Sequence, residues 1–270
     1  MGIQKFFHKI IVGFIRLLAP SIPKTDDKKK YGSSGENDFI KDIKAYLPDC
    51  KIKRNVIIHT SNRENAEIDC LLLYKNKLFA IEVKSWKGRI VEYNENKFLQ
   101  YTSRNVKEHN SPFKQLKRAV YLLKKEIPQK DWINTVVFIR DSDSVDIKSD
   151  NVWFDDINDL VSYIVNDGKD VWENNSEMFF KRCNSADYLY RYANDSFLQC
   201  QIYNFSFKVD KNRISSINIS HHWSYDAIKI YTCYGKSYTI NSENAFVYVI
   251  DNGQRYRYPL CKLDYIELQN

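Results

Sequence analysis

Two neighbouring apolar segments carry three charged residues whose types and spacing suit hydrolytic chemistry. Asp69 lies inside the apolar run 67–74, and Glu82 and Lys84 lie at the end of the next run. Residues i and i+2 of a strand share a face, so we expect Glu82 and Lys84 to point the same way. Only Lys75-Asn76-Lys77 separates the two runs, which predicts a hairpin that brings Asp69 beside the other two residues.

Such a group of side chains could hold a metal ion. Two carboxylates in a partly apolar setting repel each other and are poorly solvated, and a cation between them relieves both costs. Oxygen ligands that leave positions open for water suit Mg²⁺ or Mn²⁺. The alternative is that strand-end carboxylates face water, because an E-x-K spacing also arises by chance. An acidic residue embedded in one strand and separated by twelve residues from Glu-Val-Lys at the end of the next is more specific.

The elements that would position these residues form a sheet covered by helices. Apolar residues recur at helical spacing in three segments, and the continuous run 133–139 is typical of a strand buried on both faces. This order of elements predicts an α/β fold with a mixed sheet flanked by helices. The predicted elements are a helix over 35–47, strands over 53–59, 67–74 and 78–83, a helix over 111–125, a strand over 133–139 and a helix over 157–164.

The rest of the chain predicts a second, smaller domain. From Gln199 the sequence consists of short alternating runs, and Asp251-Asn252-Gly253 is typical of a tight hairpin turn. We therefore expect a small all-β domain at the C-terminus. The predicted organisation is an amphipathic helix and linker over residues 1–30, the α/β domain over 31–168, a helical connector over 169–198 and the β domain over 199–270.

The N-terminal segment 3–19 predicts a helix with basic residues near one side and large apolar residues over most of the rest. It falls short of the ~20 apolar residues that a spanning helix needs. It also lacks the small-residue cleavage site of a secretory signal. Two interpretations stay open. The helix lies on an anionic membrane surface, helped by Lys24 and residues 28–30, or it packs on the protein itself or on a partner.

Charge is sorted along the chain. Residues 97–130 carry nine basic groups against two glutamates, whereas residues 131–168 carry two basic groups against nine aspartates. A basic stretch can follow a phosphate backbone, which points to nucleic acid, although a solvated helix face would show the same composition. His109 precedes a predicted helix cap, and we interpret it as a loop histidine more readily than as a proton shuttle.

Composition narrows the class of protein. The chain has 270 residues, of which 43% are hydrophobic and 28% are charged, as in globular proteins. The six cysteines include no C-x-x-C pair, which excludes a zinc ribbon or a thioredoxin-type motif. Six reduced cysteines in a chain with an ample core are typical of the cytoplasm, so we expect a cytoplasmic protein. If residues 3–19 bind a membrane, we expect the same protein to be associated with that membrane.

Five short motifs around Asp69, Glu82 and Lys84 resemble those of the nuclease-related domain (NERD) branch of the PD-(D/E)xK nucleases. In chain order they are Gly35-Glu36, Glu67-Ile68-Asp69, Ile81-Glu82-Val83-Lys84-Ser85, Gly88-Arg89-Ile90 and Asn110-Ser111-Pro112-Phe113-Lys114-Gln115. The resemblance covers roughly residues 31–165 and neither the N-terminal helix nor the β domain. It implies a restriction-endonuclease-like core that acts on DNA with Mg²⁺ or Mn²⁺.

Carried over by position, the resemblance implies a role for each residue. Asp69 and Glu82 would be metal ligands, with the Val83 carbonyl oxygen as a candidate third. Lys84 would orient the attacking water or stabilise the transition state. Glu36 would be an accessory acid that reaches the metal through water.

The helix after the strands would serve the substrate. Gln115 would position substrate or the catalytic groups. Lys114, Lys117 and Arg118 lie on the same helix, which would flank the site and hold the DNA backbone without reading sequence. The sequence departs from the family twice: one residue separates Asn110 from the usual proline, and Phe98 stands where a tryptophan is expected. These departures bear on substrate specificity more than on the carboxylates.

Two hypotheses follow. The first is a metal-dependent nuclease that hydrolyses DNA phosphodiester bonds. The second is a non-cleaving DNA-binding module, or an assembly module associated with a membrane or a partner, on a nuclease-like fold. The intact trio of Asp69, Glu82 and Lys84 favours the first, and an RNA substrate stays open.

Overall fold

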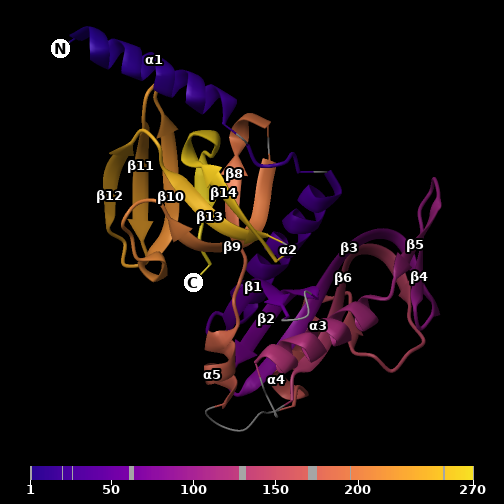
Figure 1. Ribbon diagram of the computed structural model, residues 1–270. Coiled ribbons are helices and arrows are strands. Elements are labelled where there is room, and N and C mark those ends of the chain that lie inside the picture. Colours follow the sequence, from indigo (N-terminus) through magenta and orange to yellow (C-terminus); the bar gives the residue numbers. More distant parts are fainter. Residues whose placement is uncertain are drawn as a thin grey trace. The chain divides into compact units, whose positions relative to one another are not determined.

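The structure is a computed structural model that describes residues 2–19, 21–25, 27–60, 64–127, 132–169, 175–194, 196–251 and 253–269. The chain forms two compact units (Figure 1). The α/β unit is Asp27–Asn184. The β unit is made of both ends of the chain, Met1–Asp26 and Ser185–Asn270.

The α/β unit contains a mixed sheet that has seven strands among the described residues. Strands β1 to β5 pair in sequence order in the antiparallel sense, whereas β6 lies parallel to β3 and β7 lies parallel to β6. The predicted mixed sheet is confirmed. The strands are β1 (Lys51–His59), β2 (Asn65–Tyr74), β3 (Lys77–Asn94), β4 (Lys97–Tyr101), β5 (Val106–Asn110), β6 (Asn134–Asp146) and β7 (Trp153–Phe154).

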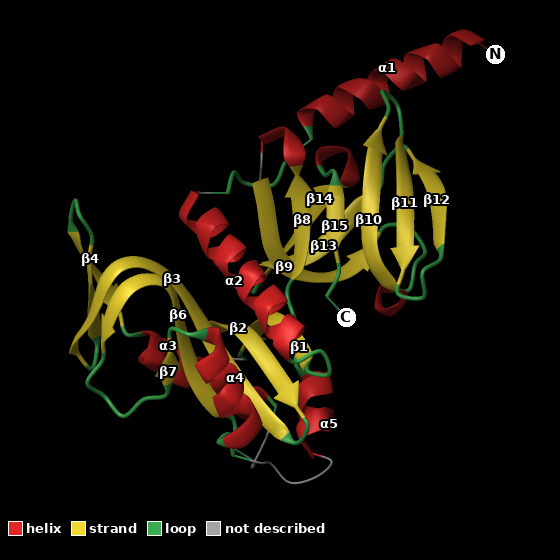
Figure 2. Ribbon diagram, turned by 180° about the vertical axis from the view of Figure 1, so that it is seen from behind, coloured by secondary structure: helices red, strands yellow, loops and turns green. Residues whose placement is uncertain are grey.

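Helices cover both faces of this sheet (Figure 2). They are α2 (Asp27–Tyr46), α3 (Pro112–Glu126), α4 (Ile157–Asn166) and α5 (Asn175–Arg182). α3 and α5 share a hydrophobic core with Leu71 and Ala80, and α2 and α4 share another with Leu72 and Phe79. Consecutive residues of a strand therefore pack into the cores on opposite faces of the sheet, as expected of strands that are buried on both faces.

α3 lies between β5 and β6 in the chain and begins close to where the sequence predicts. The Ser111 side chain accepts a hydrogen bond from the Lys114 amide, and Pro112 occupies the first turn, where its missing N–H costs nothing. Phe113 and Leu116 pack into the core. The start of α3 is thus fixed by local sequence and by burial together.

β3 is longer than the predicted strand over 78–83, because it continues to Asn94 and pairs with β4. The extension bends at Gly88, which has a φ of 86° and lies at a register shift against β6. A Cβ at Gly88 would lie 2.1 Å from the Tyr101 carbonyl oxygen, so glycine is required there. The sequence does not predict β4 and β5, because most of their side chains are exposed or half-buried and show no apolar alternation.

The β unit holds a curled sheet with eight strands in the part of the chain that the structure describes, in the order β12-β11-β10-β15-β8-β9-β13-β14. Its core includes Ile217, Ile228 and Ile266. The predicted separate all-β sheet is confirmed. The strands are β8 (Asp187–Arg191), β9 (Ser196–Phe205), β10 (Ile214–His221), β11 (Asp226–Thr232), β12 (Ser237–Ser242), β13 (Phe246–Asp251), β14 (Gln254–Pro259) and β15 (Tyr265–Glu267).

The connecting segments differ from the sequence prediction. Within the stretch 169–198, expected to be helical, α5 and a 3₁₀ turn at Tyr192–Asn194 are helical, but β8 is a strand between β15 and β9. Tyr188 and Leu189 are buried there, so sheet packing decides the conformation. α2 begins at Asp27, inside the predicted linker.

The N-terminal helix α1 (Gly2–Leu18) forms over the predicted amphipathic segment and belongs to the β unit. After it, Ile22 is buried in the β-unit core, and the Thr25 hydroxyl donates to the Phe197 carbonyl over 2.7 Å. One side of α1 therefore packs on the protein itself, which is one of the two interpretations of this segment. No helix among the described residues is long and apolar enough to cross a membrane.

Candidate functional site

The hairpin of β2 and β3 brings Asp69 to the end of the β3 core segment. The antiparallel register ends at the pair Cys70↔Ile81, which leaves Asp69 and Glu82 as the next residues of the two strands. Asp69 Oδ2 accepts a hydrogen bond from the Val83 amide over 2.8 Å. This bond fixes the Asp69 carboxylate across β3, one residue from Glu82.

Glu82 is a buried carboxylate whose hydrogen bonding is incomplete. Its side chain is 0% exposed, and Oε1 accepts a hydrogen bond from Lys84 Nζ over 2.5 Å. Its other oxygen, Oε2, has no hydrogen-bond partner among the described residues. Burial and the nearby Asp69 raise the pKa of Glu82 to about 8. A buried acceptor without a donor costs about 1–3 kcal/mol, so the fold retains this oxygen at a cost in stability.

Lys84 carries the positive charge of the site. Burial alone would lower the pKa of Lys84, but the carboxylates of Glu82 and Asp69 outweigh burial and leave that pKa raised. The ammonium is therefore charged at neutral pH. Lys84 and Glu82 share a face of β3, as their spacing predicts.

Glu36 approaches the cluster from α2. Gly35 packs so closely on β3 that a Cβ at this position would lie 2.0 Å from the Ser85 hydroxyl oxygen, and the Gly35 carbonyl accepts a hydrogen bond from Arg140 of β6 over 3.0 Å. These contacts hold the helix against the strand that carries Lys84. Burial and then Asp69 raise the pKa of Glu36 to about 7.

Asn55 and Glu67 complete the cluster, and the sequence analysis gives neither a role. The Asn55 amide donates to Glu36 Oε2 over 2.8 Å and to Glu67 Oε1 over 2.9 Å. Asn55 has a φ of 46° within β1, a conformation that asparagine adopts more readily than most residues. Glu67 lies two residues before Asp69, so the i, i+2 rule could have indicated it; nothing in the sequence indicates Asn55.

Burial also shifts Asp69. Its pKa is raised to about 6, first by burial and further by Glu67, while Lys84 and the Val83 amide oppose the shift. Three carboxyl groups, those of Glu36, Asp69 and Glu82, therefore have raised pKa values around one lysine. Perturbed pKa values cluster at functional sites, which makes this group the candidate site of the α/β unit.

The predicted substrate residues lie on the exposed side of α3. Gln115 is exposed, and its backbone N–H donates to the Ser111 carbonyl as part of the helix. Lys114, Lys117 and Arg118 are also exposed. Each donates to a neighbouring acceptor in the described chain, namely Asn96, Asn151, and the pair Glu64 and Asn65 respectively.

Beyond Lys84 on the same strand, Trp86 forms an aromatic pair with His109 of β5. The Trp86 ring stacks on His109, with 4.5 Å between the ring centroids, and His109 Nε2 lies 2.9 Å from Gln100 Oε1. Burial, Lys107 and Lys84 lower the pKa of His109 to about 4. His109 is therefore neutral at physiological pH and is held in β5 by its neighbours, not in a loop as the sequence predicts.

The side chains fit a hard cation only if water or substrate supplies further ligands. No group of three or more His, Cys, Asp or Glu side chains converges as metal ligands among the residues that the structure describes. Asp69 and Glu82 would therefore provide two carboxylates, with the unpartnered Glu82 Oε2 as the oxygen in need of a positive charge. Mg²⁺ is commonly bound by one or two carboxylates together with water and substrate phosphate, so the donor set fits this ion.

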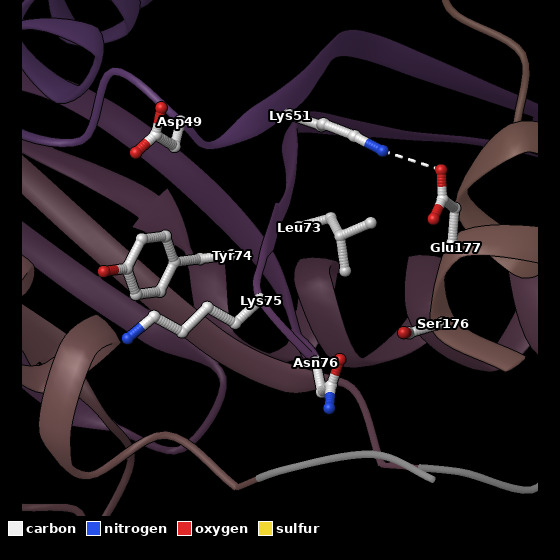
Figure 3. Close-up of a pocket in the computed structure, with 8 residues that line it drawn as sticks. All are labelled: Asp49, Lys51, Leu73, Tyr74, Lys75, Asn76, Ser176 and Glu177. Atoms are coloured by element: carbon white, nitrogen blue, oxygen red, sulfur yellow. Dashed lines mark hydrogen bonds and ion pairs between the residues drawn. The ribbon is translucent and has the colours of Figure 1, made fainter. Parts of the chain in front are cut away.

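A pocket of about 470 Å³ lies elsewhere in the α/β unit (Figure 3). Its lining includes Tyr74, Lys75 and Asn76 at the turn between β2 and β3, and Lys51 forms an ion pair with Glu177 at 2.7 Å. The turn is about six residues before Glu82, or ~20 Å along a strand. This pocket is therefore separate from the carboxyl cluster.

Comparison with protein families locates one match. Residues 31–140 match the sequence model of the family described as nuclease-related domain, NERD. The matched segment contains Glu36, Asp69, Glu82 and Lys84 and ends within β6. No curated protein matches the chain, and no solved structure does. The resemblance seen in the motifs is therefore confirmed as a match of residues 31–140 to the nuclease-related domain family.

Proposed function

We propose that the α/β unit is a metal-dependent nuclease of the PD-(D/E)xK type that hydrolyses DNA phosphodiester bonds. The observation that carries the proposal is the buried Glu82 carboxylate, which lies beside Asp69 with one oxygen paired to Lys84 and the other without a hydrogen-bond partner in the described chain. Most buried polar atoms in proteins have a hydrogen-bond partner, so this oxygen calls for an explanation. A carboxylate oxygen without a hydrogen-bond donor could be satisfied by a bound cation.

Each site residue would have a separate role in this reaction. Asp69 and Glu82 would hold Mg²⁺ or Mn²⁺, with the Val83 carbonyl oxygen as a further ligand. The ion would supply a bound water of lowered pKa and positive charge for the phosphate oxygens. Lys84 would donate to the oxygen on which negative charge grows, since its raised pKa keeps it protonated. Glu36, which accepts a hydrogen bond from Asn55, would act as the accessory acid that reaches the metal through water.

The exposed face of α3 would bind the DNA backbone. Lys114, Lys117 and Arg118 would exchange their present acceptors for phosphate oxygens, an exchange that costs little because surface pairs of this kind are worth about 0–1 kcal/mol. Such contacts position the duplex without reading its sequence. Gln115 lies on the same face and would contact substrate rather than the metal ligands.

The test is cleavage of supercoiled and linear DNA by the purified full chain in Mg²⁺, Mn²⁺ or EDTA. We expect cleavage that needs the ion, and loss of at least a hundredfold in rate for Asp69→Asn, Glu82→Gln and Lys84→Ala. Glu92→Gln is the matched control: Glu92 is also a buried carboxylate of β3, but it accepts hydrogen bonds from the Lys148 and Ser149 amides and is expected to retain activity. Full activity in all three site variants would disprove the proposal.

One observation favours the alternative of a non-cleaving DNA-binding or assembly module. The described residues contain no ready-made group of three metal-binding side chains. This alternative predicts DNA retention in a filter-binding or gel-shift assay, without turnover in either ion. It also predicts that Glu82→Gln leaves retention unchanged, whereas replacement of Lys114, Lys117 and Arg118 by glutamine removes it.

A further inference from the structure

Helix α1 packs on the β unit through a side on which Val12 and Arg16 are buried and His8 lies in contact with Glu243. The Arg16 guanidinium is 8% exposed, forms an ion pair with the buried Asp226 and donates to the Glu243 carbonyl over 3.0 Å. About two turns earlier, His8 Nε2 lies 3.0 Å from a carboxylate oxygen of Glu243. At the other end, Lys262 Nζ donates to the Leu17 carbonyl over 2.9 Å. Polar groups therefore anchor the described length of the helix.

A glycine allows this close approach. A Cβ at Gly13 would lie 2.3 Å from Cε2 of Trp223, so the indole ring lies directly on the helix backbone. Trp223 follows β10 and remains 61% exposed. Tryptophan with one face packed and the other exposed is enriched where a protein meets the membrane interface.

The apolar side of α1 points away from the β unit. Ile11, Phe14, Ile15 and Leu18 follow the i, i+3, i+4, i+7 spacing of one helix face, and each is between 56% and 81% exposed. A surface helix normally buries its apolar face and exposes its polar face. α1 buries Arg16 together with Val12 and leaves its larger apolar face exposed, so this face is available to an external apolar phase.

Charge favours a lipid surface over a second copy of the chain. Residues 1–26, the N-terminal part of the β unit, carry four basic groups against one aspartate, a net charge of +3. Anionic headgroups attract such a segment, whereas two copies of it repel each other. The helix is not long and apolar enough to span a bilayer, which leaves an orientation in the plane of the interface.

We propose that α1 is an interfacial anchor that binds an anionic lipid bilayer through Ile11, Phe14, Ile15 and Leu18. The β unit holds the opposite side of the helix by Arg16 and presents this face outward. Trp223 lies at the depth of the headgroups beside it. The anchor does not depend on the nuclease proposal, because it uses residues of the β unit alone.

The test is co-sedimentation of the full chain with lipid vesicles. We expect at least tenfold stronger partitioning to phosphatidylcholine vesicles with about 30% phosphatidylglycerol than to pure phosphatidylcholine, and weaker binding at about 0.5 M salt. The double variant Phe14→Ser/Leu18→Ser should lose at least tenfold in partitioning, because both side chains are exposed and would leave the acyl boundary.

Two controls distinguish binding through α1 from nonspecific binding of exposed aromatic residues and from misfolding of the variant. Tyr192→Ser/Tyr234→Ser removes exposed aromatic surface elsewhere on the β unit and should partition like the unaltered chain. Unchanged thermal unfolding of the Phe14→Ser/Leu18→Ser variant shows that the fold is intact. Two results overturn the proposal: equal partitioning of both double variants, or absence of vesicle binding together with a dimer in analytical ultracentrifugation that Phe14→Ser/Leu18→Ser dissociates.

Discussion

At the scale of single residues, the proposed chemistry depends on three carboxyl groups whose pKa values are raised. Burial and mutual repulsion raise the pKa of Asp69 to about 6, that of Glu36 to about 7 and that of Glu82 to about 8. The folded state therefore binds protons more tightly than the unfolded state does. Their contribution to stability is greatest below the unfolded pKa values, near pH 4, and is lost as the pH rises through 6 to 8.

This linkage gives a prediction for Glu82→Gln. In EDTA at pH 8 the variant should be more stable than the unaltered protein by roughly 1–3 kcal/mol, because the buried charge is gone. The difference should shrink towards pH 4, where Glu82 is protonated in both states. Urea unfolding across this pH range measures it. A variant that is less stable at pH 8 would show that the carboxylate is a structural member of an ion pair.

A second prediction at this scale concerns Lys84→Met. Removal of the ammonium leaves Glu82 and Asp69 without their cation, so the EDTA-treated protein should lose roughly 3–5 kcal/mol at pH 8. Addition of Mn²⁺ should restore part of this loss, since the ion would replace the missing charge. Thermal unfolding with and without the ion checks both statements, and equal unfolding temperatures of variant and parent would contradict them.

At the scale of elements, close backbone packing places the side chains. Gly35 lets α2 lie on Ser85 of β3 and so brings Glu36 to the cluster. Much of the α/β unit could be predicted, because the hydrophobic periods of β2, β3, β6 and α3 are strong. The β4–β5 extension could not, since its exposed strands are decided by pairing with β3 rather than by an apolar pattern.

Gly35→Ala tests this packing. The added methyl would collide with the Ser85 side chain and shift α2, and we expect a threefold to tenfold drop in the cleavage rate. Ser85→Gly in the same chain should recover part of the activity because it removes the colliding atoms. Ser34→Ala, at an exposed position of the same helix, is the control. Unchanged rates in Gly35→Ala would mean that Glu36 is not required at its present position.

At the scale of the whole molecule, the two ends of the chain fold together. Arg16 and Asp226 are 210 residues apart and form a buried ion pair, and Thr25 bonds to Phe197 across 172 residues. No local pattern can indicate such pairs, which is why the sequence predicts an N-terminal linker where the structure has a packed segment. Similarly, the sequence suggests Asp69, Glu82 and Lys84 as one group, but it cannot supply Asn55, whose role depends on the meeting of α2, β1 and β2.

Because both ends of the chain form the β unit, we expect Arg16→Met to destabilise that unit and to leave the α/β unit unchanged. Loss of the guanidinium leaves Asp226 buried with His221 as its remaining side-chain partner, and the β unit should lose roughly 3 kcal/mol. Hydrogen exchange measured by mass spectrometry should show faster exchange in β10 and β11 and unchanged exchange in β2 and β3. Lys9→Met, an exposed basic residue of the same helix, should change neither. Faster exchange in β2 and β3 would contradict the division into two units.

The central claim is that Asp69 and Glu82 together take up a hard cation, and titration of the full chain with Mn²⁺ tests it most directly. Calorimetry or electron paramagnetic resonance should detect binding that is at least tenfold weaker in both Asp69→Asn and Glu82→Gln and unchanged in Glu92→Gln. Binding of equal strength in the two site variants, or no binding to the unaltered chain with DNA present, would contradict the claim.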